Sequence, residues 1–154
     1  MRRKPRGFVR IAILHLLQES PMHGYRIMKT LEARSDGYYS ASPGTIYPAL
    51  QELLKREFIT VKTISDKKTY VINEQGQAKL RAFKEKRPDD FWDNWKERWI
   101  WQSSDEARKL YKALDVWEAE LRQAIRQARK QPDTTKHLIN FIEDITKKLK
   151  QDHE

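Results

Sequence analysis

A group of polar, aromatic and cationic side chains between positions 42 and 56 has the composition needed to read DNA. If this stretch is helical, one face carries Gly44, Tyr47, Pro48, Gln51 and Lys55, with no acid among them. Glutamine can pair bidentately with an adenine edge. Lysine and tyrosine side chains can hold backbone phosphates. A face of this kind is what a DNA reader presents to the major groove. Taken alone, the stretch also fits an ordinary amphipathic surface helix.

The opposite face of the same stretch predicts where it packs. Ser42 can cap a helix with its hydroxyl, and Pro43 suits the first helical position. Apolar side chains then recur on one face at helical spacing, at Ile46, Leu50, Leu53 and Leu54. Because Pro48 lacks the N–H that would bond to the Gly44 carbonyl, residues 42–47 are expected to form a separate tight turn. The regular helix would then run over residues 48–56.

Four side chains of this stretch receive specific expected roles. Thr45 and Gln51 are the candidates for contacts with base edges. Tyr47 and Lys55 are expected to contact the phosphate backbone. A tight turn at residues 42–47 would place Thr45 and Tyr47 at the tip that meets DNA. Gln51 would lie one turn further along the groove.

The distribution of charge points to a polyanionic partner for the first part of the chain. The net charge is +9, and residues 1–87 hold 18 Lys and Arg against 8 Asp and Glu. Residues 88–154 hold 13 basic against 14 acidic residues, so the whole surplus lies in the first part. A basic arm at the start, with Arg2, Arg3 and Lys4, adds further candidates for DNA contact.

Residues 42–56 form the candidate reading helix, and the elements on either side of it follow a recognisable order. Apolar residues at helical spacing predict one helix from Phe8 to Leu17, and a second from about His23 with Tyr25, Met28 and Leu31 facing inward. Two alternating runs, 59–63 and 69–72, predict a β-hairpin whose polar turn carries Lys67 and Lys68 at its tip. Asn73 is expected to cap a fourth helix that ends near Arg87. Three helices, a hairpin and a helix form the winged helix-turn-helix pattern, in which the hairpin lies along the DNA backbone.

The remainder of the chain predicts helices that pack against one another or against a second chain. Asp89 or Asp90 should cap a helix rich in tryptophan, and Ser103 to Asp105 should cap a longer one. The longer helix carries apolar residues at alternating steps of three and four, a heptad seam. We interpret this seam as a dimer interface, formed with the same helix of a second chain or with the final helix. Its expected dimerisation residues are Leu110, Leu114, Trp117, Leu121 and Ile125.

These patterns predict a mainly α fold with a small β-hairpin. Residues 1–87 would form a winged helix-turn-helix domain, and residues 88–154 a helical dimerisation region that could also sense an effector. The boundary is expected near residues 86–88.

Trp92, Trp95 and Trp99 fall on one broad helical face and allow two interpretations. Large rings at such spacing are typical of core or dimer packing, where they bury much area. They could instead line a pocket for a small aromatic effector. Packing is the favoured interpretation, because the heptad helix beside them needs a partner surface.

Nothing in the sequence favours an enzyme, and no cofactor is expected. The four histidines show no metal-ligand spacing, and no glycine-rich phosphate loop is present. The chain has no cysteine, so it has no disulfide, thiolate zinc site or cysteine nucleophile. No apolar run is long enough to cross a membrane and no signal peptide is evident. These features lead us to expect a cytoplasmic protein.

Three motifs, in order and at the expected separations, resemble the PadR family of transcriptional regulators. They are residues 21–25 (PMHGY), 42–50 (SPGTIYPAL) and 68–76 (KTYVINEQG). Together they cover roughly residues 8–83, while the C-terminal half is more divergent. The resemblance implies a winged-helix DNA-binding domain, a helical dimerisation region and repression of a nearby operon. By the match, Ser42, Gly44, Thr45, Tyr47 and Pro48 lie on the recognition element. Where the family usually has Leu-Thr, this chain has Ile72-Asn73, and asparagine still caps a helix.

The resulting expectation is a homodimeric regulator, a repressor, that binds a palindromic operator. Half-sites would lie about one helical turn apart. Two alternatives remain open at this point. One is a sequence-tolerant architectural DNA-binding protein, and the other is a helical adaptor whose basic half binds acidic proteins.

Overall fold

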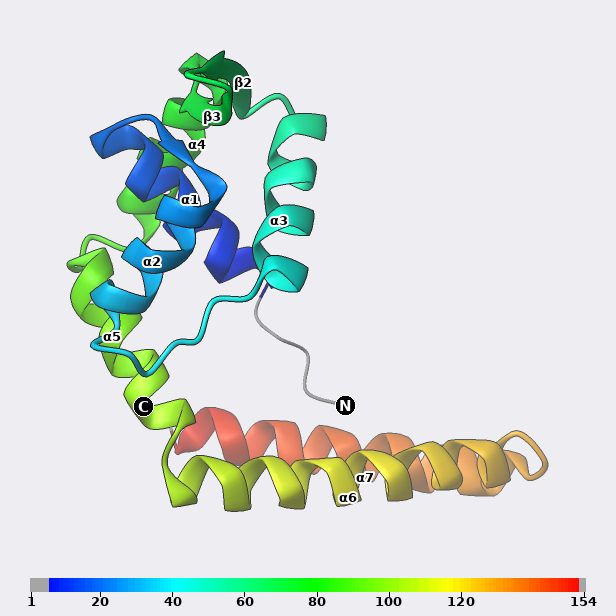
Figure 1. Cartoon of the computed structure of the whole chain (residues 1–154). Coiled ribbons are helices and arrows are strands. Elements are labelled where there is room, and N and C mark those ends of the chain that lie inside the picture. Colours follow the sequence, from blue (N-terminus) through cyan, green and yellow to red (C-terminus); the bar gives the residue numbers. More distant parts are fainter. Residues whose placement is uncertain (1–5, 153–154) are drawn as a thin grey trace. The chain divides into compact units, whose positions relative to one another are not determined.

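The computed structural model describes residues 6–152 and shows a helical chain with one small sheet (Figure 1). The elements, in chain order, are α1 (Arg6–Glu19), β1 (Met22–His23), α2 (Gly24–Arg34), α3 (Pro43–Lys55), β2 (Ile59–Ile64), β3 (Lys67–Ile72), α4 (Glu74–Lys86), α5 (Phe91–Gln102), α6 (Asp105–Ala128) and α7 (Pro132–Gln151). The predicted mainly α fold with a winged helix-turn-helix is confirmed.

Helix α1 lies at the centre of the N-terminal core. It contacts α2, α3 and α4 and also strand β3. Its side chains Ala12, Ile13 and Leu16 have no exposed surface, which explains why α1 shows an almost uninterrupted apolar sequence. The short helices α2 and α3 each bury one apolar stripe against it. None of these helices is long enough to be stable alone, so the shared core is what holds them.

Helix α2 buries the expected stripe except at Tyr25. The buried residues are Gly24, Ile27, Met28 and Leu31, which follow the i, i+3, i+4, i+7 pattern of a single helical face. Tyr25 lies off that stripe and is 60% exposed. The prediction that Tyr25 faces inward is therefore wrong, because position 25 lies about 100° around the helix from Gly24 and so outside the buried face.

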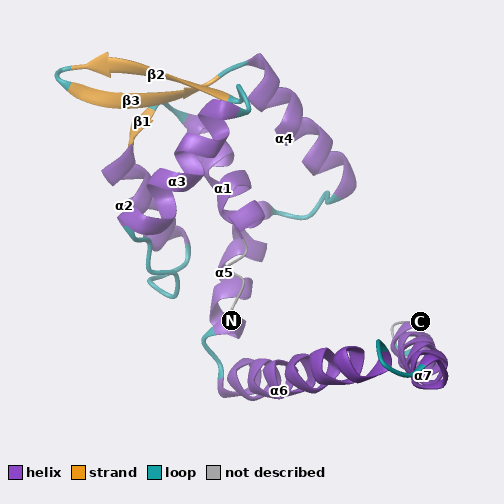
Figure 2. Ribbon diagram, turned by 90° about the vertical axis from the view of Figure 1, so that its right-hand side faces the viewer, coloured by secondary structure: helices purple, strands orange, loops and turns teal. Residues whose placement is uncertain are grey.

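The sheet has three antiparallel strands in the order β1-β3-β2, so it contains one strand more than the expected hairpin (Figure 2). Strand β1 is only two residues long and pairs Met22 with Tyr70. The hairpin turn is also tighter than expected. Ser65 and Asp66, with φ of 49° and 61°, form the whole connection between β2 and β3. Two central residues with positive φ are typical of a type I′ turn, whose twist matches that of the strands.

Helix α5 belongs to the same compact unit as the winged helix. Contacts divide the chain after Ala107, beyond the boundary expected near residues 86–88. Phe91 and Trp95 of α5 are buried in the N-terminal core, and the indole N–H of Trp95 donates to the Leu31 carbonyl at 3.3 Å. Asp90 caps the helix as expected, with its Oδ1 accepting from the Trp92 amide at 2.8 Å. The first unit is therefore a winged helix with a fifth helix packed into its core.

The second unit, from Arg108 onward, consists of most of α6 and of α7. Ser104 precedes α6, and its hydroxyl accepts from the Ala107 amide at 3.1 Å, as a helix cap does. A short connection leads into α7, where the Thr135 hydroxyl donates to the Ala128 carbonyl at 3.0 Å. None of the described α7 residues is fully buried. Each helix therefore keeps a large part of its apolar stripe on the surface.

His15 on α1 makes the stability of the first unit depend on pH. Its ring is buried and stacks on Phe91, with centroids 4.1 Å apart. Burial is the main cause that lowers its pKa from 6.5 to about 4; Lys84 adds to this, and Asp90 opposes it. The folded state therefore binds this proton more weakly than the unfolded chain does. Titration of His15 therefore leaves the free energy of unfolding unchanged above about pH 6.5. It lowers this free energy by roughly 3 kcal/mol as the pH falls toward 4.

Urea unfolding between pH 7 and pH 4 measures this effect. We expect the wild-type protein to lose more stability over this range than a His15→Phe variant, by roughly 3 kcal/mol. Carboxylates titrate in both proteins, so the difference between the two curves isolates His15. Parallel curves would contradict the assignment.

Candidate nucleic-acid interface

The candidate reading helix is one continuous α-helix from Pro43 to Lys55. The expected break into a tight turn and a helix beginning at Pro48 is therefore wrong. Pro48 lies within the second turn, where only the bond to the Gly44 carbonyl is lost. Gly44 is exposed, so water can satisfy that carbonyl. The apolar stripe with Ile46, Leu50 and Leu53 buries the opposite side and keeps the helix intact.

The first turn of α3 is held by backbone bonds and not by the expected hydroxyl cap. Ser42 is extended, with φ of −120° and ψ of 152°, and its carbonyl accepts from the amides of Thr45 and Ile46 at 3.0 Å. The Ser42 and Thr45 hydroxyls lie 3.1 Å apart. The prediction that the Ser42 hydroxyl caps the helix is wrong, since the hydroxyl is engaged with Thr45.

The outward face of α3 has the composition inferred from the sequence. The exposed residues of this face are Gly44, Tyr47, Pro48, Gln51 and Lys55. Thr45 is partly exposed beside them. A side chain on this face can approach a groove without disturbing the core, because the residues that face the core are different ones.

The one carboxylate on the flank of α3 is neutralised by two arginines. Glu52 forms ion pairs with Arg10 of α1 and, at 2.8 Å, with Arg56. Partial burial acts to raise the pKa of Glu52, but the charges of Arg10 and Arg56 bring it below its ordinary value. Glu52 thus stays ionised and paired, which limits its repulsion of a nearby phosphate. Sequence reasoning missed Arg10 and Arg56, although the i, i+4 spacing of Glu52 and Arg56 was visible.

The wing is fixed to the end of α3 by a tight C-terminal motif. Glu57 has a φ of 59°, the Phe58 amide donates to the Leu53 carbonyl, and the Glu57 amide donates to the Leu54 carbonyl, both at 3.0 Å. This pair of bonds is the Schellman motif. The Asn73 side-chain amide also donates to the Glu57 carbonyl at 2.6 Å. The hairpin therefore has a defined position relative to the reading helix (Figure 2).

Lys67 and Lys68 lie at the beginning of strand β3, directly after the turn, and both are exposed. They were expected inside a longer turn, whereas only Ser65 and Asp66 connect the strands. Neighbouring residues of a strand point to opposite faces, so the two lysines extend from different sides of the wing. The expected contacts of Arg2, Arg3 and Lys4 lie outside the described residues.

The tryptophans of α5 contribute to packing. Trp95 has no exposed surface, and Trp99 lies edge-on to it with ring centroids 5.3 Å apart. Trp92 stacks against the Arg34 guanidinium, 4.6 Å from its ring centre. The rings thus join α5 to α2 and to the core.

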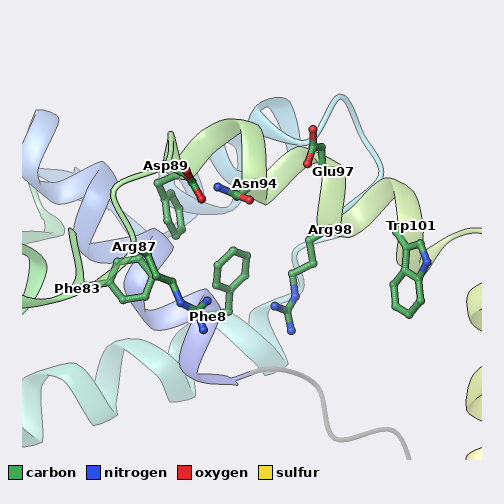
Figure 3. A pocket seen from close by; sticks show the side chains of 9 residues that line it. Phe8, Phe83, Arg87, Asp89, Asn94, Glu97, Arg98 and Trp101 are labelled. Carbon is green, nitrogen blue, oxygen red and sulfur yellow. The ribbon is translucent and has the colours of Figure 1, made fainter. Parts of the chain in front are cut away.

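A cavity of about 530 Å³ lies on another side of α5, and none of these three tryptophans lines it. Its aromatic part consists of three phenylalanines and one tryptophan, Phe8, Phe83, Phe91 and Trp101. Figure 3 shows the side chains of Arg87 and Arg98 extending toward it. The Arg98 guanidinium lies 4.6 Å from the Phe8 ring centre. Its buried Nε has no hydrogen-bond partner in the part of the chain that the structure describes.

The expected dimer seam on α6 is largely exposed. Leu110, Leu114, Trp117 and Ile125 all present apolar surface to solvent, and Leu121 is half-buried. The α7 helix adds exposed apolar residues of its own, among them Phe141 and Leu149.

Residues 6–152 contain no group of three or more His, Asp or Glu side chains placed to hold a metal ion. Nor does any helix in this range combine the length and apolarity that crossing a bilayer requires.

Known proteins match both the sequence and the fold. The sequence profile of the transcriptional regulator PadR-like family matches residues 13–82. The transcriptional regulator YqjI of Escherichia coli (strain K12) is 30% identical over 145 residues, which cover 91% of this chain and 70% of that protein. A transcriptional regulator from Clostridium thermocellum has a similar structure, with a TM-score of 0.50 and 28% identity over 53% of this chain and 83% of the other.

Bacillus subtilis PadR, solved in complex with operator DNA, is also similar. It has a TM-score of 0.48 and 24% identity over 82% of this chain and 77% of its own. The profile match covers the winged helix, and the similarity to the Escherichia coli protein extends over nearly the whole sequence. By the profile match and the Escherichia coli relative, the chain belongs to the PadR-like family of transcriptional regulators.

Proposed function

We propose that this protein is a DNA-binding transcriptional repressor that acts as a homodimer on a palindromic operator. The observation that carries the proposal is the outward face of α3, which is exposed, polar and cationic on a helix whose other side is buried. The wing lysines extend the cationic surface, and the neutralised Glu52 removes the main local repulsion. A repressor of this kind acts where the chromosome is, so we assign it to the cytoplasm.

Within this interface, Gln51 and Thr45 are assigned to base edges, and Tyr47, Lys55, Lys67 and Lys68 to the phosphate backbone. Gln51 lies at the middle of the exposed stripe, one turn after Tyr47. A glutamine there can form two hydrogen bonds with adenine. Lysine contacts supply affinity without sequence preference.

Gel shifts across a salt series and footprinting test this function. We expect duplex DNA to bind at low salt, and the footprint to show two protected half-sites about one helical turn apart. Uniform coverage of the duplex would favour a sequence-tolerant architectural protein. Absence of binding even at low salt would leave the adaptor for acidic proteins as the better assignment.

The homodimer is assigned to the exposed seam of α6, with α7 contributing. Four large apolar side chains along one helical face are costly to leave in water. A second copy of the chain, with an identical seam, offers a matching surface. Two copies would also place two reading helices on one palindrome, which the proposed operator requires.

Replacing Trp117 with alanine should weaken this dimer by roughly 10- to 100-fold, since large aromatic residues dominate such interfaces. Trp117 is 42% exposed in the single chain, and circular dichroism of the variant checks that α6 and α7 remain helical. Sedimentation equilibrium over a dilution series measures the change. Val116→Ala is the matched control, because Val116 is exposed on the adjacent position outside the seam. Equal dimer affinity of the Trp117 variant and the wild-type protein would contradict the assignment.

A small aromatic effector is a further proposed partner. The cavity beside α5 supports it better than the tryptophan cluster does, because Trp95 has no free surface for a ligand. Planar aromatic compounds added to the gel shift test this proposal. Release of DNA from the wild-type protein, together with retention by an Arg98→Gln variant, is the expected result.

A further inference from the structure

A second recess, of about 340 Å³, lies where the reading helix, the wing and the start of α2 meet. Strand β1 runs along β3 and leads directly into α2, which brings the first residues of that helix next to the wing (Figure 2). The recess is lined by His23, Gly24 and Tyr25 from this junction, by Tyr47 from α3, and by wing residues that include Lys67 and Lys68.

The chemistry of this recess suits an anion. Two lysines and three tyrosines, counting Tyr70, are among the residues that line it, and none of the lining residues carries a carboxylate. Lys68 and Tyr70 are two positions apart on β3, so both side chains leave the strand on the same face. Tyr70 is buried; burial first, and then the nearby Tyr47, raises the pKa of its phenol. All these groups can donate a hydrogen bond at neutral pH.

Two features indicate that the recess is not simply part of the core. Tyr25 is 60% exposed although it stands at the start of a helix whose other large apolar residues are buried. Gly24 leaves the space that the Tyr47 ring occupies, because a Cβ at position 24 would lie 2.8 Å from Tyr47 Cε1. Because Gly24 has no side chain, the Tyr47 ring can lie against the start of α2, and the Tyr47 side chain is still 42% exposed.

We infer that this recess binds one phosphate of the DNA backbone, with Lys68 and Tyr25 as its principal ligands. The phosphate would be the one that the duplex presents between the segment read by α3 and the segment that lies along the wing. This assignment rests on the proposed function and adds the start of α2 to the DNA interface. Lysine supplies the charge, and the tyrosine hydroxyl fixes the position of the phosphate.

Two substitutions remove these ligands without removing core contacts. Lys68→Gln deletes a charge from an exposed side chain, and Tyr25→Phe deletes only a hydroxyl. Lys62→Gln is the matched control, because Lys62 is an exposed lysine of the same hairpin that does not line the recess. Lys62 pairs with Thr69 whereas Lys68 pairs with Thr63, so the two lysines point to opposite faces of the wing.

The experiment uses the full-length protein and a duplex selected by it in vitro from random sequence. Single methylphosphonate linkages, which lack the phosphate charge, are introduced one at a time along that duplex. At one linkage per half-site, we expect the losses of affinity caused by the methylphosphonate and by Lys68→Gln not to be additive. Lys68→Gln alone should lower affinity roughly tenfold at about 0.1 M salt and reduce the salt slope by about 0.9. Tyr25→Phe should lower affinity roughly three- to tenfold with an unchanged slope.

The control and the competing outcomes make the assignment falsifiable. Lys62→Gln should remain additive with the methylphosphonate at that linkage. Additive effects of Lys68→Gln and Tyr25→Phe at every linkage would overturn the assignment while the proposed function stands. Failure of the wild-type protein to bind any duplex would overturn both together.

Inorganic phosphate titrated into the protein gives the last comparison. If Lys68→Gln abolishes its binding, seen by phosphorus NMR, and leaves DNA affinity unchanged, the recess takes a free phosphate and the assignment is wrong.

Discussion

Replacing Lys55, Lys67 and Lys68 together with glutamine should lower the affinity for duplex DNA roughly 100- to 1000-fold at about 0.1 M salt. Each lysine that neutralises a phosphate releases a condensed counterion, which is the source of the effect. The slope of log affinity against log salt should fall by about 2.7 for three lost contacts. All three side chains are exposed, so the free energy of unfolding should stay close to that of the wild-type protein. Fluorescence anisotropy over a salt series measures both quantities.

The control for this triple variant is the same loss of charge on α7. Lys147, Lys148 and Lys150 are exposed and have no expected role at the reading surface. Their replacement with glutamine tests how much of the effect comes from net charge alone, and we expect a loss below tenfold. Equal losses in the two triple variants would show that the lysines of α3 and the wing form no dedicated interface.

Replacing Gly76 with alanine should destabilise the first unit by roughly 2–4 kcal/mol. Gly76 lies in the first turn of α4, where a Cβ would be 2.2 Å from the Phe58 carbonyl oxygen and 2.7 Å from Ile72 Cγ1. The Phe58 carbonyl accepts from the Asn73 amide, and the Asn73 side chain accepts from the Gly76 amide at 3.0 Å. Moving α4 away would therefore break its own cap. Glycine is needed here for space and not for an unusual φ.

Urea unfolding measures the effect, and Gly44→Ala is the control. Nothing lies within 4 Å of a Cβ at Gly44, so alanine there should be neutral or should stabilise α3 by up to about 1 kcal/mol. If Gly76→Ala lowers the free energy of unfolding and Gly44→Ala does not, the close contact at Gly76 is the cause of the loss. A Gly76→Ala variant with the same free energy of unfolding as the wild-type protein would contradict the close approach of α4 to Phe58.

The elements of the winged helix could be predicted because local patterns and the core agree there. The period of apolar residues changes from helical to alternating at Ile59, and strand β2 begins at that residue. Asn73 was identified as a cap from its position alone, and its side chain does accept from the Gly76 amide. The outward face of α3 could be predicted in the same way, because the residues of an amphipathic helix that lie outside its buried stripe face solvent.

The parts that sequence could not supply depend on contacts between distant segments. Strand β1 is two residues long and has no pattern of its own; only its pairing with β3 defines it. The continuity of α3 through Pro48 depends on how firmly its buried side is held, which no local rule states. Helix α5 joins the first unit through Trp95, whose ring stacks on Phe8 of α1 and whose indole N–H donates to the Leu31 carbonyl of α2. Spacing alone could not show these contacts.

The five tryptophans are divided between the two units in a way that gives the protein two optical reporters. Four of them lie in α5, and Trp95 among these is fully enclosed, whereas Trp117 is the one tryptophan of the sequence that follows Ala107. Replacing Trp117 leaves an emission spectrum that reports on the winged-helix unit alone. The difference between that spectrum and the wild-type spectrum isolates the light emitted by α6. Emission of the two proteins, compared at concentrations where both are monomeric or both are dimeric, can thus follow the seam and the DNA-reading unit separately without any attached label.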